Sequence, residues 1–276
     1  MTPPANVHRA PRPVLVVTDL DGTLLDHDTY SFDAARPALA RLAAAGVALV
    51  PASSKTVAEL EPLCARLGTG APRIAENGSV LDIPAGSIDP STAARRLSLG
   101  TRYEDVLAQL ATLRADGFRF RGFADMDDAE VAERTGLPVE QARLARARDA
   151  SEPLLWQDGD SRLNEFTARL DAAGLAAVRG GRFVSVQARI DKADAVRRLT
   201  DLFADAHGGA RPFVIAAGDA ANDLAMLSSA DIAVVVASPT GSRLGDPSAP
   251  TVLRPDGLGP EGFRRGIDTA LDRLGL

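Results

Sequence analysis

The sequence predicts an α/β protein in which a doubly wound, mostly parallel sheet carries an inserted α+β domain. Short unbroken apolar runs at 14–17, 47–50 and 213–217 each end in turn residues, which is typical of strands buried on both faces of a parallel sheet. Between about 87 and 187 the pattern changes to helices that alternate with half-exposed strands. At 276 residues, the chain is long enough for a core domain and a second, smaller domain.

The first part of the chain alternates strands with helices. We expect, in order, a strand at 14–17, a helix at 32–45, a strand at 47–50, a helix at 56–67 and a strand at 73–75. Gly46 and Gly68 follow the two helices, where a left-handed cap is expected. This βαβαβ alternation predicts a parallel sheet with helices on its faces.

The middle of the chain carries more elements, and they are shorter. We expect helices at 102–115, 127–135, 138–148 and 160–173, and strands at 118–123, 153–156, 175–179 and 182–187. The strand at 118–123 alternates apolar and basic residues, which indicates a sheet with one face in solvent. The sequence therefore predicts an inserted α+β domain whose sheet has an open face.

The α/β pattern returns in the last part of the chain. Asp191 can cap a helix with one apolar face, which is formed by Val196, Leu199, Leu202 and Phe203. We then expect a strand at 213–217, a helix from about Asn222, a strand at 232–237 and a helix at 260–274. The predicted domains are 1–86 and 188–276 for the two parts of the core and 87–187 for the insertion, with a flexible tail at 1–12.

Composition argues against several classes of function. A net charge of −6 offers no basic face for nucleic acid. The longest apolar runs are far shorter than the roughly 20 residues of a membrane span, so we expect no membrane partner. The single cysteine, Cys64, excludes a disulfide framework, and the N-terminus has no apolar stretch like that of a signal peptide. We therefore expect a cytoplasmic protein.

An acidic turn follows the first expected strand and contains Asp19 and Asp21. In open α/β sheets, ligands bind beyond the carboxyl ends of the strands, so both carboxylates are expected in one crevice. Two such groups can share the cleavage of a phosphate ester. Asp19 would attack phosphorus, while Asp21 would protonate the leaving group and later take a proton from water. The alternative is an ordinary Asp–Gly turn.

Ser53 and Ser54 follow the second strand, at the expected N-terminus of a helix. A hydroxyl and backbone N–H groups in that position form an anion site, although a serine there can also be a plain helix cap. Lys55 and Lys192 are the only lysines in a chain with 29 arginines, and both lie at expected junctions between a strand and a helix. A compact ammonium suits phosphate oxygens as a point charge, so we interpret Lys192 as a phosphate-binding residue.

A second acidic cluster follows the strand at 213–217. Mg²⁺ prefers one or two carboxylates together with phosphate oxygens and waters. Asp219 can supply one ligand, joining Asp19 and the backbone carbonyl of Asp21. Asn222 and Asp223 can hold waters of the ion or orient Lys192, and the alternative for either is helix capping.

Together these motifs resemble those of the haloacid dehalogenase superfamily of phosphatases. The resemblance lies in the residues DLDGTLL, Ser53, Lys192 and GDAANDLAML at 218–227. Glu-Asn-Gly at 76–78 and the insertion are similar to the sugar-phosphatase branch with a C2-type cap. The segments most similar to the mannosyl-3-phosphoglycerate phosphatase family are TDLDGTLLD at 18–26, SSKT at 53–56, GFADM at 122–126, residues 131–153, GGRF at 180–183 and LGPEGFRRGID at 258–268.

The resemblance implies a role for each matching residue. It implies Asp19 as the nucleophile and Asp21 as the general acid and base. The implied magnesium ligands are Asp19, Asp21, Asp219 and Asp223, and the implied phosphate-binding residues are Ser53, Ser54, Lys192 and Asn222. A phosphosugar that carries a glycerate needs cationic and hydroxyl partners, for which the candidates are Lys55, Arg148, Ser151, Glu152 and Arg182. The alternative for the arginines is a solvated charge or a surface ion pair.

The implied reaction is the dephosphorylation of mannosyl-3-phosphoglycerate to mannosylglycerate. Glucosyl-3-phosphoglycerate and a sucrose-phosphate-like ester stay open as alternative substrates. A phosphotransferase or mutase is a further alternative, which would pass the phosphoryl group to a sugar hydroxyl. A catalytically idle regulatory homologue is the last alternative, but it would have no chemical need for Asp19, Asp21, Lys192 and Asp219 together.

Overall fold

The computed structural model describes residues 12–180, 182–238 and 244–276 and divides the chain into two compact units. Unit 1 comprises 1–18, 22–49 and 197–276, and unit 2 comprises 19–21 and 50–196. The predicted tail at 1–12 lies outside the described residues except for Arg12, whose side chain donates hydrogen bonds to the carbonyls of Arg211 and Pro212.

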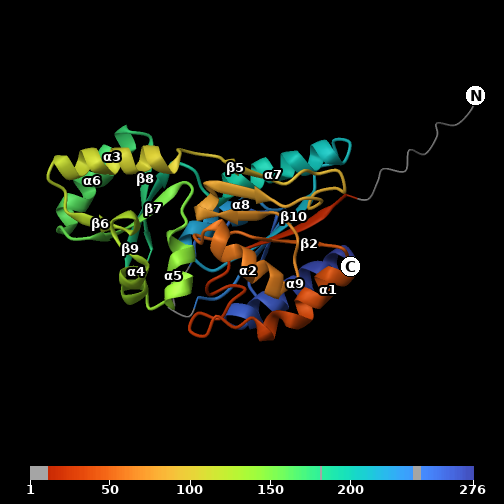
Figure 1. Ribbon diagram of the computed structural model, residues 1–276. Helices are drawn as coiled ribbons and strands as arrows, with labels where there is room; N and C mark the ends of the chain where they lie inside the picture. Colours follow the sequence, from red (N-terminus) through yellow and green to blue (C-terminus); the bar gives the residue numbers. More distant parts are fainter. Residues whose placement is uncertain (1–11, 181, 239–243) are drawn as a thin grey trace, which may run out of the picture. The chain divides into compact units, whose positions relative to one another are not determined.

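A five-stranded sheet forms the centre of the fold in unit 1 (Figure 1). Its strands are β1 (Val14–Thr18), β2 (Ala48–Pro51), β10 (Phe213–Gly218), β11 (Ile232–Val235) and β12 (Thr251–Leu253). The order is β12-β11-β10-β1-β2, and β1, β10, β11 and β12 run parallel to one another. The chain moves outward from β1 in both directions, so the strand order reverses between β1 and β10, where such sheets bind ligands. The predicted α/β class with a mainly parallel sheet is confirmed.

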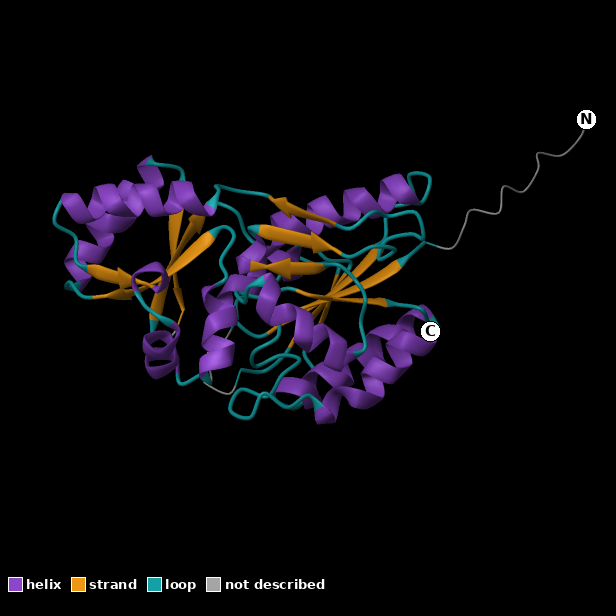
Figure 2. Cartoon of the chain, in the orientation of Figure 1, coloured by secondary structure: helices purple, strands orange, loops and turns teal. Residues whose placement is uncertain are grey.

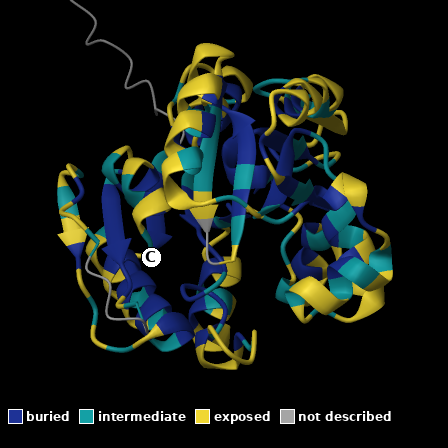
Figure 3. Ribbon diagram, turned by 90° about the vertical axis from the view of Figure 1, so that its left-hand side faces the viewer, coloured by how far each residue is buried: buried dark blue, intermediate teal, exposed yellow. Residues whose placement is uncertain are grey.

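Helices pack on this sheet, and β1, β2, β10 and β11 are almost entirely buried, whereas Val252 of the edge strand β12 is exposed (Figure 3). They are η1 (Asp33–Ala35), α1 (Arg36–Ala44), α7 (Lys192–Ala206), η4 (Ala221–Asp223), α8 (Leu224–Ser228) and α9 (Gly259–Leu274). Helix α9 packs against β11 and α1, and α8 packs against β10 and β11. The predicted cap at the start of α7 is confirmed, because Asp191 and Asp194 each accept the backbone N–H of the other at 3.0 Å.

Unit 2 contains two antiparallel sheets and several helices (Figure 2). The strands are β3 (Arg73–Ala75), β4 (Val80–Ile83), β5 (Arg95–Ser98), β6 (Phe120–Gly122), β7 (Ser151–Trp156), β8 (Leu175–Gly180) and β9 (Phe183–Ala188). The helices are α2 (Val57–Leu67), η2 (Glu76–Gly78), α3 (Tyr103–Ala115), η3 (Phe123–Asp125), α4 (Asp128–Thr135), α5 (Val139–Arg146) and α6 (Asp160–Ala172). Among the described residues of the whole chain, no helix is both long and apolar enough to cross a membrane.

The sheet β6-β7-β9-β8 has the predicted α+β character, but its second face is not fully open. One face packs an aromatic core around Phe118, Phe120 and Phe166. On the other face, Leu155 and Phe183 pack against a buried cluster contributed by η3, α4 and α5. The alternation along 118–123 correctly indicated two different faces. The prediction of an open face was partly wrong, because two short helices shield it.

The strand at 73–75 exists as β3, but its main pairing differs from the prediction. We expected it in the parallel sheet, whereas β3 pairs antiparallel with β4, which in turn pairs with β5. A single parallel bridge, Ala52 to Ile74, joins it to the residue after β2. The βαβαβ alternation was therefore right about the elements and wrong about the partner of the last strand.

Candidate active site

Asp19 forms a buried ion pair with Lys192. Asp19 lies directly after β1, and the preceding residue Thr18 pairs with Ala217 of β10. Asp19 therefore lies at the carboxyl end of β1, where the strand order of the sheet reverses between β1 and β10. Asp19 is 8% exposed and Lys192 is 1% exposed. The Nζ atom of Lys192 donates to Oδ1 of Asp19 at 2.5 Å. Because a buried ammonium is stable only when it is paired, this contact explains why a lysine is tolerated here.

Asp219 and Asp223 follow β10 and are also buried. Oδ2 of Asp223 accepts the backbone N–H of Asp219 at 3.2 Å and that of Ala220 at 3.1 Å, so Asp223 does cap the turn, as the alternative reading of this residue allowed. The hydroxyl of Thr23 donates to Oδ1 of Asp219 at 2.8 Å. These bonds fix the orientation of both carboxylates.

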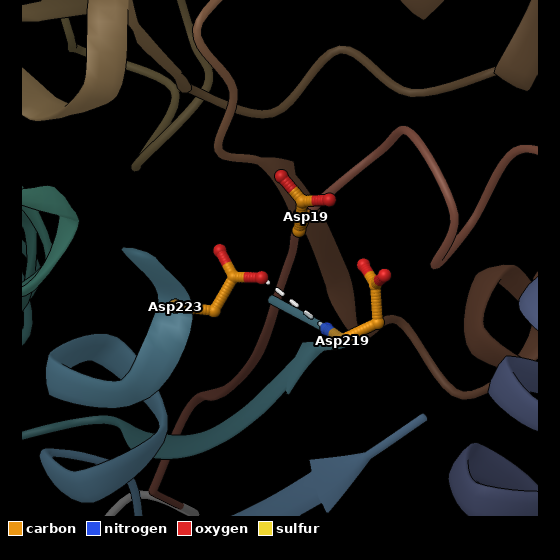
Figure 4. A group of neighbouring side chains, drawn as sticks. All are labelled: Asp19, Asp219 and Asp223. Atoms are coloured by element: carbon orange, nitrogen blue, oxygen red, sulfur yellow. Dashed lines mark hydrogen bonds between the residues drawn. The ribbon is translucent and has the colours of Figure 1, made fainter. Parts of the chain in front are cut away.

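Asp19, Asp219 and Asp223 each offer a carboxylate oxygen, and these oxygens lie within 4.8 Å of one another (Figure 4). Three buried carboxylates so close together repel one another unless cations offset their charge. Oxygens on opposite sides of a Mg²⁺ ion are about 4.2 Å apart, so the donor set fits this ion after a small adjustment. The cluster contains three of the four predicted metal-binding side chains.

The side chain of the fourth, Asp21, pairs with Lys55. The Nζ atom of Lys55 donates to Oδ2 of Asp21 at 2.6 Å. Oδ1 of Asp21 is buried and has no hydrogen-bond partner among the described residues. Lys55 was predicted as a substrate-binding residue. The structure instead places its ammonium on the predicted general acid and base.

The residues Ser53–Lys55 form a short loop between β2 and α2, called the phosphate loop below because two of its residues, Ser53 and Ser54, are predicted to bind phosphate. Ser53 is buried, and its Oγ accepts the backbone N–H of Lys55 at 3.3 Å, while Ser54 is exposed. Neither serine caps α2. Thr56 does so through a capping box with Glu59, a pattern that is visible in the sequence as Thr-x-x-Glu. The two serines are therefore not needed to cap the helix.

Glu76 is a buried residue to which the sequence reasoning assigned no chemical role. It has no exposed surface, yet it carries a carboxylate. That carboxylate accepts the backbone N–H groups of Asp149 and Ala150 and the hydroxyl of Ser151, at 2.7, 3.1 and 2.6 Å, and it forms an ion pair with Arg148. Two predicted substrate-binding residues, Arg148 and Ser151, are thus engaged with this carboxylate in the structure.

Glu152 is engaged in the interior of unit 2. The residue is 1% exposed, and its carboxylate accepts the hydroxyl of Tyr103 at 2.8 Å and the backbone N–H of Ala124 at 2.7 Å. Burial raises the pKa of Glu152, and these hydrogen bonds oppose the rise only in part. Burial also raises the pKa of Tyr103, and the neighbouring carboxylate adds to that rise.

Two other predicted residues lie at the surface. Arg182 is exposed and donates to the carbonyl of Thr135 at 2.8 Å. Asn222, predicted to bind phosphate, is exposed as the central residue of η4. The glycine pair that precedes Arg182 includes Gly181, which lies outside the described residues.

Comparison with known proteins bears on the same features. Residues 16–93 match the family model of haloacid dehalogenase-like hydrolases, and this span includes Asp19, Asp21, the phosphate loop and Glu76. Solved structures of the same fold extend the likeness to nearly the whole chain.

Three of these structures are phosphatases. One, a phosphatase of the haloalkanoate superfamily from Bacteroides thetaiotaomicron, is 20% identical with a TM-score of 0.64, over 99% of this chain and 97% of that one. A subclass IIB sugar phosphatase is 17% identical with a TM-score of 0.60, over 95% and 99% of the two chains. The sucrose-phosphatase from Synechocystis sp. PCC6803, solved with sucrose and phosphate, is 15% identical with a TM-score of 0.59, over 96% and 98%. At these identities the structures show a shared fold.

Proposed function

We propose that this protein is a magnesium-dependent phosphohydrolase that cleaves a phosphomonoester through an aspartyl-phosphate intermediate on Asp19. The observation that carries the proposal is the buried pair of Asp19 and Lys192, 2.5 Å apart, beside the carboxylates of Asp219 and Asp223. An unprotonated carboxylate held against an ammonium is a suitable nucleophile for phosphorus. The family match over 16–93 and the phosphatases among the proteins of the same fold support this assignment.

In the proposed first step, an oxygen of Asp19 attacks phosphorus and the ester P–O bond breaks. The ammonium of Lys192 offsets the negative charge on the phosphoryl oxygens. The Ser53 hydroxyl and the N–H of Ser54 bind phosphoryl oxygens, because the phosphate loop precedes a helix N-terminus whose partial positive charge favours an anion.

Asp21 is the proposed general acid and base. Protonated Asp21 gives its proton to the departing alkoxide, and the resulting carboxylate then takes a proton from the water that hydrolyses the aspartyl phosphate. Its Oδ1 atom has no protein donor among the described residues, so a ligand can contact it. Lys55, bound to the other oxygen, orients the carboxylate.

Asp19, Asp219 and Asp223 are the proposed ligands of Mg²⁺, together with the backbone carbonyl of Asp21. When bound, the ion offsets the repulsion between the anionic nucleophile and the anionic phosphate. The donor set is made of hard carboxylate oxygens, which this ion prefers. The hydroxyl of Thr23 holds one of these carboxylates in place.

We propose a phosphosugar as the substrate and, within that class, mannosyl-3-phosphoglycerate. The class is supported by the sugar phosphatases that share the fold. The finer choice rests on the resemblance of 122–126, 131–153 and 258–268 to the mannosyl-3-phosphoglycerate phosphatase family. We also propose that 87–187 is the domain that selects the substrate.

A phosphate-release screen tests both levels of this proposal. The panel contains mannosyl-3-phosphoglycerate, glucosyl-3-phosphoglycerate, sucrose phosphate and simple hexose phosphates, each with Mg²⁺ and with a chelator. We expect Mg²⁺-dependent release that is highest with mannosyl-3-phosphoglycerate and absent in Asp19→Asn. Release from all esters without preference would contradict the substrate, and retained release in Asp19→Asn would contradict the nucleophile.

A further inference from the structure

The three carbonyl groups of the phosphate loop are each held by a hydrogen-bond donor. The donors come from only two places in the chain, the Glu76–Asn77 turn and Arg148. The bonds are Asn77 N–H to the carbonyl of Ser53 at 2.9 Å, an Nη2 hydrogen of Arg148 to that of Ser54 at 3.2 Å, and Glu76 N–H to that of Lys55 at 3.0 Å.

This arrangement fixes the direction of the loop's N–H groups. In a trans peptide the C=O and N–H bonds point to opposite sides of the chain. Because the carbonyl of Ser53 points to Asn77, the N–H of Ser54 points the other way, and it has no acceptor among the described residues. An N–H held in this way is already oriented for an anion.

The carboxylate of Glu76 positions one of these donors, the guanidinium of Arg148. Its ion pair with Arg148, 3.5 Å long, keeps the guanidinium in place, and Ser151 bonds to both side chains. The planar fork of Arg148 then reaches both Ser151 and the carbonyl of Ser54. Glu76 therefore contacts the phosphate loop directly through its backbone and indirectly through Arg148.

The turn that carries Glu76 has an unfavourable backbone. Glu76 and Asn77 have φ values of 50° and 56°, in the left-handed region that non-glycine residues seldom occupy. Gly78, with φ of 103°, lies so close to the Asp191–Lys192 peptide that an added Cβ would be 2.1 Å from the carbonyl oxygen of Asp191. Strained residues of this kind persist where surrounding contacts hold them, and they are concentrated at functional sites.

We propose that Glu76 is a positioning residue that holds the phosphate loop in its anion-binding shape through its own backbone and through Arg148. The phosphate-binding half of this inference rests on the proposed function, whereas the holding of the loop does not. Glu76 touches no substrate in this scheme, and it acts through the residues that do.

The test compares two variants with a matched control. Glu76→Gln keeps the size of the side chain and removes its charge, and Arg148→Lys keeps the charge and removes the fork that reaches Ser54. Tyr103→Phe is the control, because it also removes a buried hydrogen bond to a carboxylate of unit 2, that of Glu152, while Tyr103 forms no hydrogen bond with the phosphate loop among the described residues. If Glu76→Gln does not fold, Arg148→Lys alone still tests whether these side chains hold the phosphate loop.

Two measurements are made on the full-length protein. Hydrogen–deuterium exchange of the amides at 53–56, without ligand, reports the holding of the loop. Calorimetric titration with inorganic phosphate in the presence of Mg²⁺ reports the affinity of the loop for phosphate. We expect exchange about tenfold faster and phosphate binding about tenfold weaker in both variants, the change expected for one lost buried hydrogen bond, and wild-type behaviour in Tyr103→Phe.

The direction of the phosphate effect is diagnostic. Removing the negative charge of Glu76 would by itself strengthen the binding of an anion, so weaker binding in Glu76→Gln points to altered loop geometry. Exchange that is unchanged, or equally raised in Tyr103→Phe, would overturn the inference, as would phosphate binding that is unchanged or tighter in Glu76→Gln. If the wild-type protein binds no phosphate, the proposed function fails, while the exchange measurement still decides whether Glu76 holds the loop.

Discussion

Replacing Gly22 by alanine is expected to disturb Asp219 and, through it, the proposed magnesium site. Gly22 has a φ of 86°, and an added Cβ would lie 2.9 Å from Oδ2 of Asp219, whereas ordinary contacts begin at 3.4 Å. The carboxylate must therefore move by about half an ångström. Its other oxygen is held by Thr23, which limits how the group can turn.

The magnitude follows from two separate effects. The left-handed backbone costs alanine about 1–2 kcal/mol of folding free energy. Metal–ligand distances tolerate shifts of only about 0.2 Å, so the displacement of Asp219 should weaken Mg²⁺ binding by roughly 10- to 100-fold. The variant Gly209→Ala separates the backbone effect from the displacement of Asp219. Gly209 has a φ of 85°, which matches that of Gly22, but an added Cβ there would meet nothing within 4 Å.

The assay measures the Mg²⁺ concentration for half-maximal phosphate release and the melting temperature of the metal-free protein. Gly22→Ala and Gly209→Ala should both lower the melting temperature, and only Gly22→Ala should raise the Mg²⁺ requirement. An equal Mg²⁺ requirement in the two variants would refute the assignment of Asp219 as a metal ligand held in place by this close contact.

Two further predictions concern buried ionisable groups. Lys192→Met should lower the rate of phosphate release by on the order of 10²–10³-fold, because the phosphoryl oxygens lose their cation. It should also lower the melting temperature, because the buried carboxylate of Asp19 loses its partner. Near-normal phosphate release would contradict the role of Lys192. Burial raises the pKa of Glu152 above its ordinary value of 4.5, so the folded protein binds the proton more tightly than the unfolded chain. The resulting stabilisation is present below that value and is lost as the pH rises through the raised pKa. Urea unfolding should therefore show the wild type losing stability relative to Glu152→Gln over this range, and a difference independent of pH would contradict the prediction.

Much of the fold could be predicted because its signals are local. The apolar runs that became β1, β2 and β10 are short and unbroken, and each ends in turn residues. Polar side chains at the carboxyl ends of parallel strands must gather at one edge, which is why Asp19 and Asp219 could be grouped from the sequence alone. The scarcity of lysine in an arginine-rich chain marked Lys192, and its burial against Asp19 agrees with that reading.

Strands β4 and β5 of the three-stranded sheet were not predicted from the sequence. Strand β5 (Arg95–Ser98) is largely exposed, so its residues show no apolar alternation. Strand β4 (Val80–Ile83), the antiparallel partner of β3, is a run of only four residues and was not predicted either, so the parallel sheet was the simpler inference for β3. The covered second face of the sheet β6-β7-β9-β8 likewise depends on tertiary packing of α4 and α5, which a single strand cannot reveal.

The partners of charged side chains were the least predictable feature. Glu76 is bound to residues more than 70 positions away, and Lys55 to Asp21, 34 positions away. Residue type indicates what a side chain can bind and not which group lies near it. The Asn77-Gly78 pair was the one local signal in the sequence near Glu76, since these residues favour tight turns with a left-handed backbone.

The central claim, that Asp19 becomes covalently phosphorylated, is tested most directly by trapping the intermediate. In Asp21→Asn the second step lacks its base, so the aspartyl phosphate should accumulate with Mg²⁺ and an aryl phosphate, whose leaving group departs without the proton that Asp21 would give to a sugar alkoxide. Acid quenching and peptide mass spectrometry should then find one phosphoryl group on the peptide that contains Asp19. A phosphoryl group on another residue, or phosphate release by the wild type with no phosphorylated Asp19 under any quench, would contradict the account.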